Sequence, residues 1–375
     1  MRRCRKILWF VVGLFSQPLL ADEPFIRHGA VVETHDGVRV EGGMTLTVQH
    51  GSDSQMRDDA LASFDLVTLL PQQGGEWTLY LEGNTTPRGN GVASLLGETN
   101  ADAGTALDGN GKGRVQVSGL YYTRPVAGNT LSLGLLDPAG ILDASEVAND
   151  ETSQFLGTGF VNNPTIAMPD HTLGSSFHVD AEAGRPGFSL LLSSSHGLAD
   201  NPQASYAELT HIGADGKGLF LGGEMYWALK RSIWHMGAWV NSADFDYLDG
   251  SGNTAGNYGV YLSTDYALSS RSKVNLRAGL ANEDVSAAAD FLALALETEF
   301  AGNTAGMGVA RTGVSRRAGP GHDDTYQAEI YWRMDINEQF QLSPSLQWIE
   351  NSGFVKTDST NSGAVFSLRL KYVFP

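Results

Sequence analysis

The chain has 375 residues, a formal net charge of −17 at pH 7 and a single cysteine. This acidic balance argues against a nucleic-acid partner, because phosphate binding needs a basic patch. Beyond residue 21 no apolar run is long enough for a transmembrane helix, so two classes remain: a soluble secreted β-protein and a transmembrane β-barrel.

Residues 1–21 have the pattern of a secretory signal peptide. Basic residues crowd the first six positions, an apolar run follows over 7–15, and Ala21 precedes an acidic pair. This order predicts cleavage after Ala21, and the apolar run is too short for a membrane anchor. The only cysteine, Cys4, lies in the segment to be removed. Residues 22–375 therefore need no disulfide and offer no cysteine to zinc.

Apolar and polar side chains alternate along much of the chain, which is the period of a β-strand. Over 38–49, Met44 and Leu46 share one face and Thr45 the other. Over 114–122, Val117 and Tyr121 are expected on one face. Helix periodicity fails for such segments, because charges would fall on every face. Comparable segments run over 76–82, 173–182, 219–230, 258–268, 273–280 and 292–300.

The last fifty residues hold three long alternating segments, over 326–336, 340–348 and 364–374. Their length of about ten to twelve residues matches a tilted strand crossing a bilayer. We count about seventeen candidate strands, and sixteen is the nearest even number. We therefore predict an all-β fold: a transmembrane antiparallel up-and-down barrel of about 16 strands over residues 22–375.

The connections between these strands differ in length. Those around 72–75 and 231–232 are tight. Short turns at one end and long loops at the other are typical of transmembrane barrels. The long polar connections are expected at 87–113, 137–171, 246–257 and 316–324.

Residues 137–171 form the candidate constriction loop. They are too many for a hairpin turn and mix carboxylates, amides and aromatics. Long loops of this kind are usually functional or disordered, so we expect this one to fold inward and narrow a pore. Asp150, Glu151 and Gln154 are its candidate lining residues. Polar residues of the strands are expected to face the water-filled lumen, namely Arg39, Glu41, Arg114, Gln116, Glu224, Tyr226, Arg277, Glu329, Tyr331, Arg333, Gln341, Gln347, Arg369 and Lys371.

Two blocks carry a family resemblance. The first is Glu146-Val-Ala-Asn-Asp-Glu-Thr-Ser-Gln-Phe155 with Phe160-Val-Asn-Asn-Pro164; the second covers 328–336 and 342–351. They resemble the carbohydrate-selective outer-membrane porins (the OprB type). The resemblance spans about 131–374 and implies a sixteen-stranded barrel that passes monosaccharides by diffusion. In that family the loop after an early strand lines the constriction, which here implicates Asn149, Asp150, Glu151, Gln154 and Phe155.

The candidate constriction and substrate-path residues are therefore Asn149, Asp150, Glu151, Gln154, Phe155, Glu329, Tyr331, Arg333, Gln347 and Arg369. The alternative is that these residues do not contact a substrate and only provide the polar surface that any water-filled lumen needs. The expected surroundings are outer-membrane lipid and lipopolysaccharide of a Gram-negative bacterium, reached through the periplasm. Resemblance to general porins implies a homotrimer. The acidic balance predicts a mild cation preference.

Other functions stay open at this point. A general diffusion porin would share every pattern above. A barrel-embedded hydrolase would need His178 or His196 to face a serine such as Ser193 or Ser195. A soluble secreted binding protein is disfavoured, because its strand faces would expose Leu, Val and Trp to water. No cofactor or metal is expected, since the glycine-rich segment 108–113 lacks a phosphate-loop ending and 244–253 lacks calcium-loop spacing.

Overall fold

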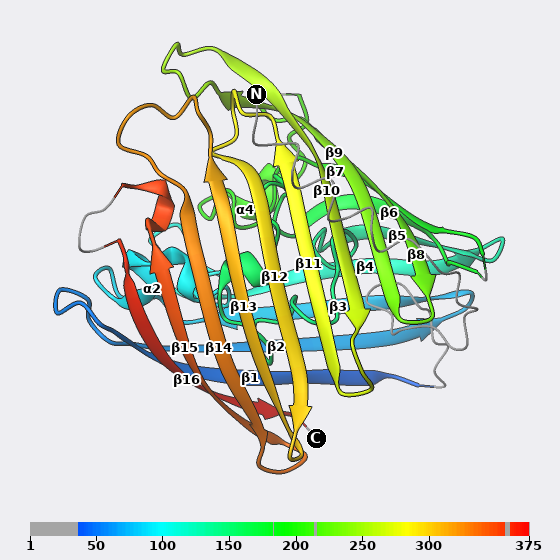
Figure 1. The fold of residues 1–375 in the computed structure, drawn as a ribbon. Coiled ribbons are helices and arrows are strands. Elements are labelled where there is room, and N and C mark those ends of the chain that lie inside the picture. Colours follow the sequence, from blue (N-terminus) through cyan, green and yellow to red (C-terminus); the bar gives the residue numbers. More distant parts are fainter. Residues whose placement is uncertain (1–36, 183, 214–215, 357–360, 375) are drawn as a thin grey trace.

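The computed structural model describes residues 37–182, 184–213, 216–356 and 361–374. The predicted signal peptide with Cys4 lies outside these ranges. Within these ranges, sixteen strands form one closed barrel in which each strand pairs antiparallel with its sequence neighbours (Figure 1). The barrel closes where β16 pairs with β1, from Gly43↔Val373 to Gly51↔Val365. The predicted antiparallel barrel of about 16 strands is confirmed.

The strands are β1 (Arg39–Gly51), β2 (Asp59–Gln72), β3 (Gly75–Asn84), β4 (Val115–Val126), β5 (Asn129–Leu136), β6 (Thr172–Val179), β7 (Gly187–Ser194), β8 (Leu219–Leu229), β9 (Ser232–Asp246), β10 (Thr254–Ala267), β11 (Ser272–Ala281), β12 (Ala288–Phe300), β13 (Asn303–Val314), β14 (Thr325–Asp335), β15 (Phe340–Glu350) and β16 (Gly363–Val373). Short helical turns lie in the loops: α2 (Val92–Leu95), η2 (Gly97–Thr99), α3 (Thr158–Val161), α4 (Ser205–Glu208) and η3 (Ser352–Phe354).

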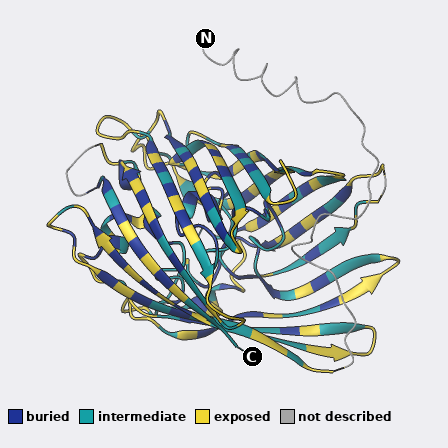
Figure 2. Cartoon of the chain, turned by 60° about the horizontal axis from the view of Figure 1, so that its bottom comes forward, coloured by how far each residue is buried: buried dark blue, intermediate teal, exposed yellow. Residues whose placement is uncertain are grey.

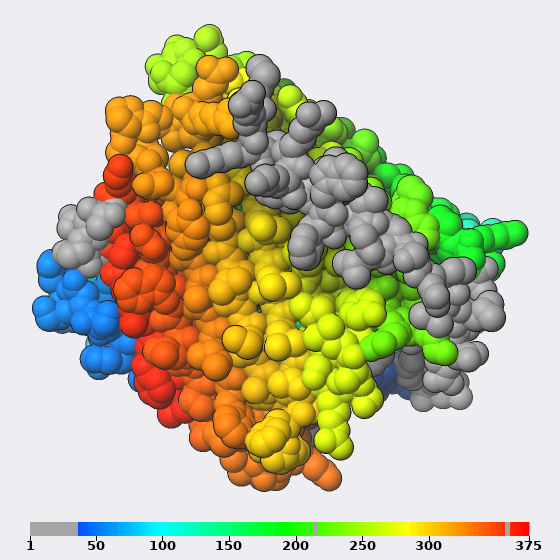
Figure 3. All heavy atoms as spheres, viewed as in Figure 1, coloured from blue at the N-terminus to red at the C-terminus, as the bar shows by residue number. Residues whose placement is uncertain are grey.

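The barrel wall is apolar outside and polar inside. On β1, Met44, Leu46 and Val48 are 44–47% exposed, whereas the inward Thr47 and Gln49 are 1% and 0% exposed. The same alternation of buried and exposed residues marks most strands (Figure 2). The space-filling view shows the strands β11–β14 closing into a continuous outer surface (Figure 3). An apolar outer face suits lipid, because hydrocarbon solvates it where water does not.

No helix in the described part of the chain is long and apolar enough to cross a membrane.

One expected face assignment is wrong. The pairing of β3 with β4 shifts register between Tyr80↔Gly119 and Leu81↔Val117, which leaves Ser118 as an extra residue. Such a bulge reverses the side-chain alternation beyond it. Tyr121 consequently packs against an interior cluster, while Leu120 is 48% exposed on the outer face. Val117 and Tyr121 therefore lie on opposite faces of β4.

The connections alternate strictly between the two ends of the barrel. One end carries short turns, such as 73–74, 127–128, 230–231 and 301–302. Ala127 and Gly128 both have positive φ (52° and 84°), as tight hairpin turns of this kind require. All the loops of ten or more residues lie at the other end. In bacterial barrels this end is extracellular and the short turns are periplasmic.

Three extracellular loops are long, and we name them L2 (85–114), L3 (137–171) and L4 (195–218). L4 was not among the predicted long loops. Its Leu198 and Leu209 pack on Leu135 and Val117 of β5 and β4. L2 and L3 instead enter the barrel: the cyan helix α2 of L2 lies beside β15 and β16, where Val92 packs on Ile349 and Val365, and the green ribbons of L3 lie behind the yellow and orange strands (Figure 1). The prediction of an inward-folded L3 is confirmed.

Candidate channel constriction

L3 is fastened to the barrel wall by a buried arginine. Arg277 of β11 is 1% exposed. Its Nη1 donates to the carbonyl oxygens of Phe160 (3.1 Å) and Val161 (3.4 Å), and its Nη2 to those of Asp143 (2.9 Å) and Ala148 (3.1 Å). Its Nε lies 3.1 Å from Oδ2 of Asp143. One guanidinium thus ties together both halves of the loop, using the fixed donor geometry of arginine.

Carboxylates of the wall complete this attachment by accepting from L3 backbone amides. Glu329 of β14 accepts from the amides of Leu156 (3.0 Å) and Gly157 (2.8 Å). Asp265 of β10 accepts from the Glu146 amide (2.8 Å), and Glu224 of β8 accepts from that of Asp143 (2.8 Å). Because a buried backbone amide needs an acceptor, these three side chains make the irregular loop tolerable inside the barrel.

Basic residues of β14 and β16 hold the tip of L3. Arg369 donates to the carbonyl oxygens of Glu151 (2.5 Å) and Gln154 (2.7 Å) and is 2% exposed. Arg333 donates to that of Ser153 (2.9 Å), and Lys371 to the Thr152 hydroxyl (2.7 Å). These charges are directed at the loop.

An apolar cluster lies beneath the same attachment. Phe155 and Phe160 of L3 pack at a ring-centroid distance of 4.8 Å. Phe155 meets Tyr331 of β14 edge-on at 4.9 Å. All three rings are at most 2% exposed. We call the contact of L3 with β8–β16, polar and apolar together, the seam.

The opposite side of L3 faces the lumen with carboxylates. Asp150 and Glu151 of L3, Asp102 of L2, and Asp65 and Tyr80 of the wall all keep part of their surface accessible inside the barrel. The Tyr80 hydroxyl donates to Asp65 (2.6 Å). Asp102 accepts from Ser63 (2.6 Å), which holds L2 against β2. We name Asp65, Tyr80, Asp102, Asp150 and Glu151 the acidic eyelet.

Two neighbouring carboxyls of the eyelet differ in protonation. Burial, with the charges of Asp102 and Asp150 beside it, raises the pKa of Glu151 to about 8. Burial also acts on Asp150, but the Lys371 ammonium and the hydroxyls of Ser153 and Thr152 hold its pKa at about 2. Burial raises the pKa of Asp102 to about 6, against the hydrogen bonds it accepts. At pH 7 the eyelet therefore has a charged Asp150 and a largely neutral Glu151.

L2 approaches the tip of L3 through buried amides. The Asn100 side chain donates to Gln49 of β1 (3.2 Å). The Gln347 side chain of β15 donates to the carbonyl oxygen of Thr99 (2.9 Å) and to Glu329 (3.1 Å). Gln347 thus links L2 to Glu329, the wall carboxylate that accepts from L3 amides, and both loops narrow the barrel.

The structure brings the ten predicted site residues to L3 and the wall around its tip. Asn149, Asp150, Glu151 and Arg333 keep accessible surface. The other six are buried in the seam or beneath L2: Gln154, Phe155, Glu329, Tyr331, Gln347 and Arg369. A substrate contact for any of the ten stays a prediction.

Sequence reasoning missed the eyelet partners outside L3. Asp65, Tyr80 and Asp102 are not among the predicted site residues, and Arg277 is predicted only to face the lumen. The only sequence feature that pointed to Asp102 as a site residue is its position in a second long polar loop, 87–113. Nothing in the sequence indicates that this loop turns inward rather than out into solvent.

His178, one of the two histidines expected for a hydrolase, has a different serine partner. His178 Nδ1 lies 2.9 Å from the Ser189 hydroxyl, not from Ser193 or Ser195. Ser189 is 3% exposed, too buried for a nucleophile that must meet a substrate. Ser195 accepts from the Gly218 amide (2.8 Å). Among the described residues, no group of three or more His, Cys, Asp or Glu is placed to hold a metal ion.

A closed sixteen-stranded barrel with loops folded into its lumen defines the porin class of outer-membrane channels. Comparison with known proteins is consistent with this class. Residues 57–374 match the sequence model described as "Carbohydrate-selective porin, OprB family". The chain belongs to this family.

Solved structures share the fold at low identity. Pseudomonas putida OprB, in a structure titled as a high-pH form, aligns over 90% of this chain and 94% of its own with a TM-score of 0.72 and 14% identity. A mutant of the Rh. blastica porin aligns over 90% and 100% with a TM-score of 0.56 and 12% identity. An uncharacterized protein of Aquifex aeolicus is 37% identical over 67 residues, and that stretch spans 22% of the relative's length.

Proposed function

We propose that the protein forms a water-filled channel in the outer membrane through which small neutral sugars diffuse down their gradient. The observation that carries this proposal is the eyelet. L2 and L3 reduce the barrel to a passage bordered by carboxylates and one aromatic ring. Carboxylates accept from sugar hydroxyls, and an aromatic face meets the C–H side of a sugar. Partial exposure of every eyelet member supports weak binding to a wet surface, which transport requires.

We also propose a cation preference. The eyelet presents four carboxyls, and Lys371 is the ammonium whose charge acts on Asp150. The guanidinium of Arg369 is buried and donates to two L3 carbonyls. An excess of negative charge at the narrowest part raises the local concentration of cations. A neutral sugar is not repelled by this field.

The experiment is single-channel recording of the purified full-length protein in a planar bilayer, titrated with glucose. We expect discrete openings that glucose blocks saturably and reversal potentials that favour cations. Tyr80→Leu is expected to weaken the glucose block, whereas Tyr80→Phe, which keeps the ring, is expected to retain most of it. Openings indifferent to glucose would instead indicate a general diffusion porin. Reversal potentials favouring anions would refute the cation preference.

The cellular setting forms part of the proposal. The apolar belt of exposed Leu, Val and Ile on the strands supports contact with outer-membrane lipid and lipopolysaccharide. Resemblance to general porins supports a homotrimer. Outer-membrane fractionation with heat-modifiable migration tests the first, and native mass spectrometry from detergent tests the second. A protein extracted without detergent, or a monomer in native spectra, would contradict the corresponding part.

A further inference from the structure

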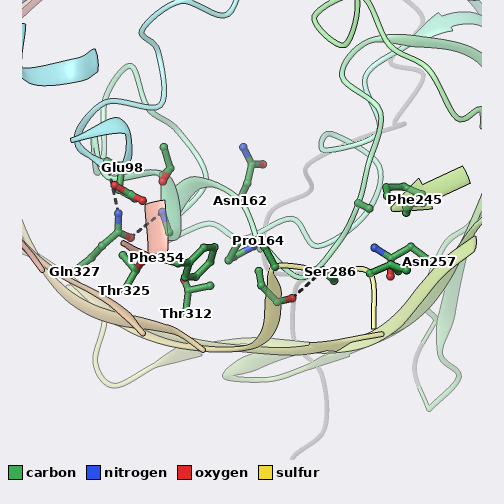
Figure 4. Close-up of a pocket in the computed structure, with 16 residues that line it drawn as sticks. Glu98, Asn162, Pro164, Phe245, Asn257, Ser286, Thr312, Thr325, Gln327 and Phe354 are labelled. Carbon is green, nitrogen blue, oxygen red and sulfur yellow. Dashed lines mark hydrogen bonds between the residues drawn. The ribbon is translucent and has the colours of Figure 1, made fainter. Parts of the chain in front are cut away.

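A pocket of about 520 Å³ lies between L3 and the extracellular ends of β9–β14 (Figure 4). Its lining includes Glu98 of L2, Asn162 and Pro164 of L3, Phe245 of β9, Gln327 of β14 and Phe354 of η3. Asn162 and Pro164 are exposed, so the pocket is accessible. Its volume is within the range of small-molecule sites. No member of the eyelet lines it.

A strained turn places an aromatic ring at one end of this pocket. Phe354 has φ = 62°, in the left-handed region that bulky side chains rarely adopt. The Glu98 carboxylate stabilises this turn by accepting from the Gly353 amide (2.8 Å) and from the Ser352 hydroxyl. Strain of this kind persists only when surrounding contacts enforce it, and it concentrates at binding sites. L2 therefore positions the Phe354 ring.

The rest of the lining combines a second ring with a free amide. Phe245 lies at the other end of the pocket, with Asn162 and Pro164 between the two rings (Figure 4). The Gln327 side chain is already engaged, because it accepts from the Gly159 amide (3.1 Å) and donates to the Glu98 carbonyl oxygen (3.1 Å). Asn162, within the described ranges, has no side-chain hydrogen bond to another residue. Its donor and acceptor remain for a ligand.

Among its described residues, the pocket lining offers no free charged group to pair with an ionic ligand. Glu98 is the single ionisable residue among the lining residues, and its carboxylate is occupied by the Ser352–Gly353 turn. Two aromatic rings with an unpaired amide between them suit a ligand with apolar C–H faces and hydroxyls at its edge. A neutral carbohydrate has both and carries no charge to desolvate.

We infer that this pocket is a docking site for a neutral carbohydrate at the extracellular mouth, separate from the eyelet. The inference rests on the proposed sugar passage and adds a station before the constriction. A sugar held there has a raised local concentration on the outer side of L3. Entry from the extracellular side is then faster than entry from the periplasmic side.

The test compares the two sides of the full-length channel in a planar bilayer with glucose as the probe. Phe354→Ala and Asn162→Ala are each expected to lower the association rate of glucose block about three- to tenfold when the sugar is added on the loop side. Addition on the turn side is expected to give unchanged rates. Phe354→Tyr should restore the ring and the rate. Val355→Ala, on the same loop but outside the lining, is the matched control.

A second measurement separates this inference from the proposed function. Phe245→Trp places a fluorophore in the pocket, and glucose is expected to change its emission saturably relative to wild type; Asn162→Ala in the same background should weaken that change. Glucose-dependent liposome swelling with no saturable emission change and no side-dependent loss of rate would overturn the pocket and leave the porin function standing. A saturable change without swelling would support the pocket and refute sugar passage.

Discussion

The two sides of L3 are built from opposite chemistry. Toward β8–β16, in the seam, guanidiniums and carboxylates of the wall are buried and paired with loop backbone. Toward β2 and β3, at the eyelet, Asp150 and Glu151 keep accessible surface beside Asp65 and Tyr80. Glu151 belongs to both the seam and the eyelet, because its carbonyl oxygen accepts from Arg369 while its carboxyl lies at the eyelet. Consecutive residues of one loop therefore combine buried contacts to the wall with surface that is accessible inside the barrel.

This contrast shows that an inward-facing charge on a barrel strand need not act on the solute. Arg277 and Arg369 point inward, yet both are at most 2% exposed beneath L3. Their guanidinium groups donate hydrogen bonds to loop carbonyl oxygens, which have no partner in the β-sheet. The carboxyls that we propose to set the field in the passage lie on the loop that these arginines hold in place.

The largest effect is expected when the seam loses Arg277. Arg277→Met leaves the buried Asp143 carboxylate and several L3 carbonyl oxygens without their donor. Removing one partner of a buried pair costs about 3–5 kcal/mol. Urea unfolding in detergent should show this loss of stability, and single-channel currents should become noisier as L3 loosens. Arg316→Met, at an exposed position of loop 315–324, is the control and should change stability by less than about 0.5 kcal/mol. Equal stability of the two variants would contradict the seam as described.

The next effect tests the outer wall, which neither side of L3 touches. Leu294 lies at the middle of β12 and is 48% exposed on the lipid face. Leu294→Arg is expected to cost about 2–4 kcal/mol, because the charge enters the bilayer midplane. Leu268→Arg, just beyond the end of β10, should cost about 0–1 kcal/mol. Unfolding from lipid vesicles measures both. Equal losses of stability in the two variants would show that Leu294 does not lie at the bilayer midplane.

A smaller effect is expected from the Glu151 carboxyl, whose charge acts at the eyelet and not in the seam. Below its pKa of about 8 the carboxyl is neutral, and above it a negative charge is added. The cation-to-anion permeability ratio should therefore rise with pH through about 8, by up to about fivefold for one charge at close range. Asp150 stays ionised throughout this range, and Asp102 titrates near 6, below the window in which Glu151 changes charge.

Glu151→Gln should remove this rise, and reversal potentials in a salt gradient measure it. Glu283→Gln, at an exposed position of loop 282–287, should keep the rise because its charge is screened. A pH profile that survives Glu151→Gln would assign the titration to another group.

The smallest effect concerns Arg333, which is partly exposed beside the tip of L3. Its guanidinium donates to the Ser153 carbonyl oxygen (2.9 Å) and the Thr304 hydroxyl (3.0 Å). Arg333→Gln should raise the cation preference by less than about twofold, because the lost charge already faces the loop. Gln341→Leu is an uncharged comparison on the neighbouring strand. A several-fold change for Arg333→Gln would place Arg333 in the solute path.

The sequence predicted the barrel well and the site only in part. Alternation such as Met44, Thr45 and Leu46 is local, so it identifies a strand and its lipid face without tertiary information. Boundaries of L3 at 137 and 171 also follow, because alternation stops at Leu136 and resumes at Thr172. The bulge at Ser118 escaped prediction, since an extra residue leaves no mark in composition and yet reverses the face of Tyr121.

By itself the sequence determined a membrane barrel, its approximate strand number, its apolar exterior and the loop that enters it. Those properties follow from the periodicity and length of each segment, and both can be read from residues that are neighbours in the sequence. Only the tertiary structure decided that L2 joins L3, that Arg277 and Arg369 bind loop carbonyls, and that Asp102 from one loop meets Glu151 from the other. These pairings join residues far apart in sequence, and their protonation depends on burial and on nearby charges. Folding alone brings such groups together.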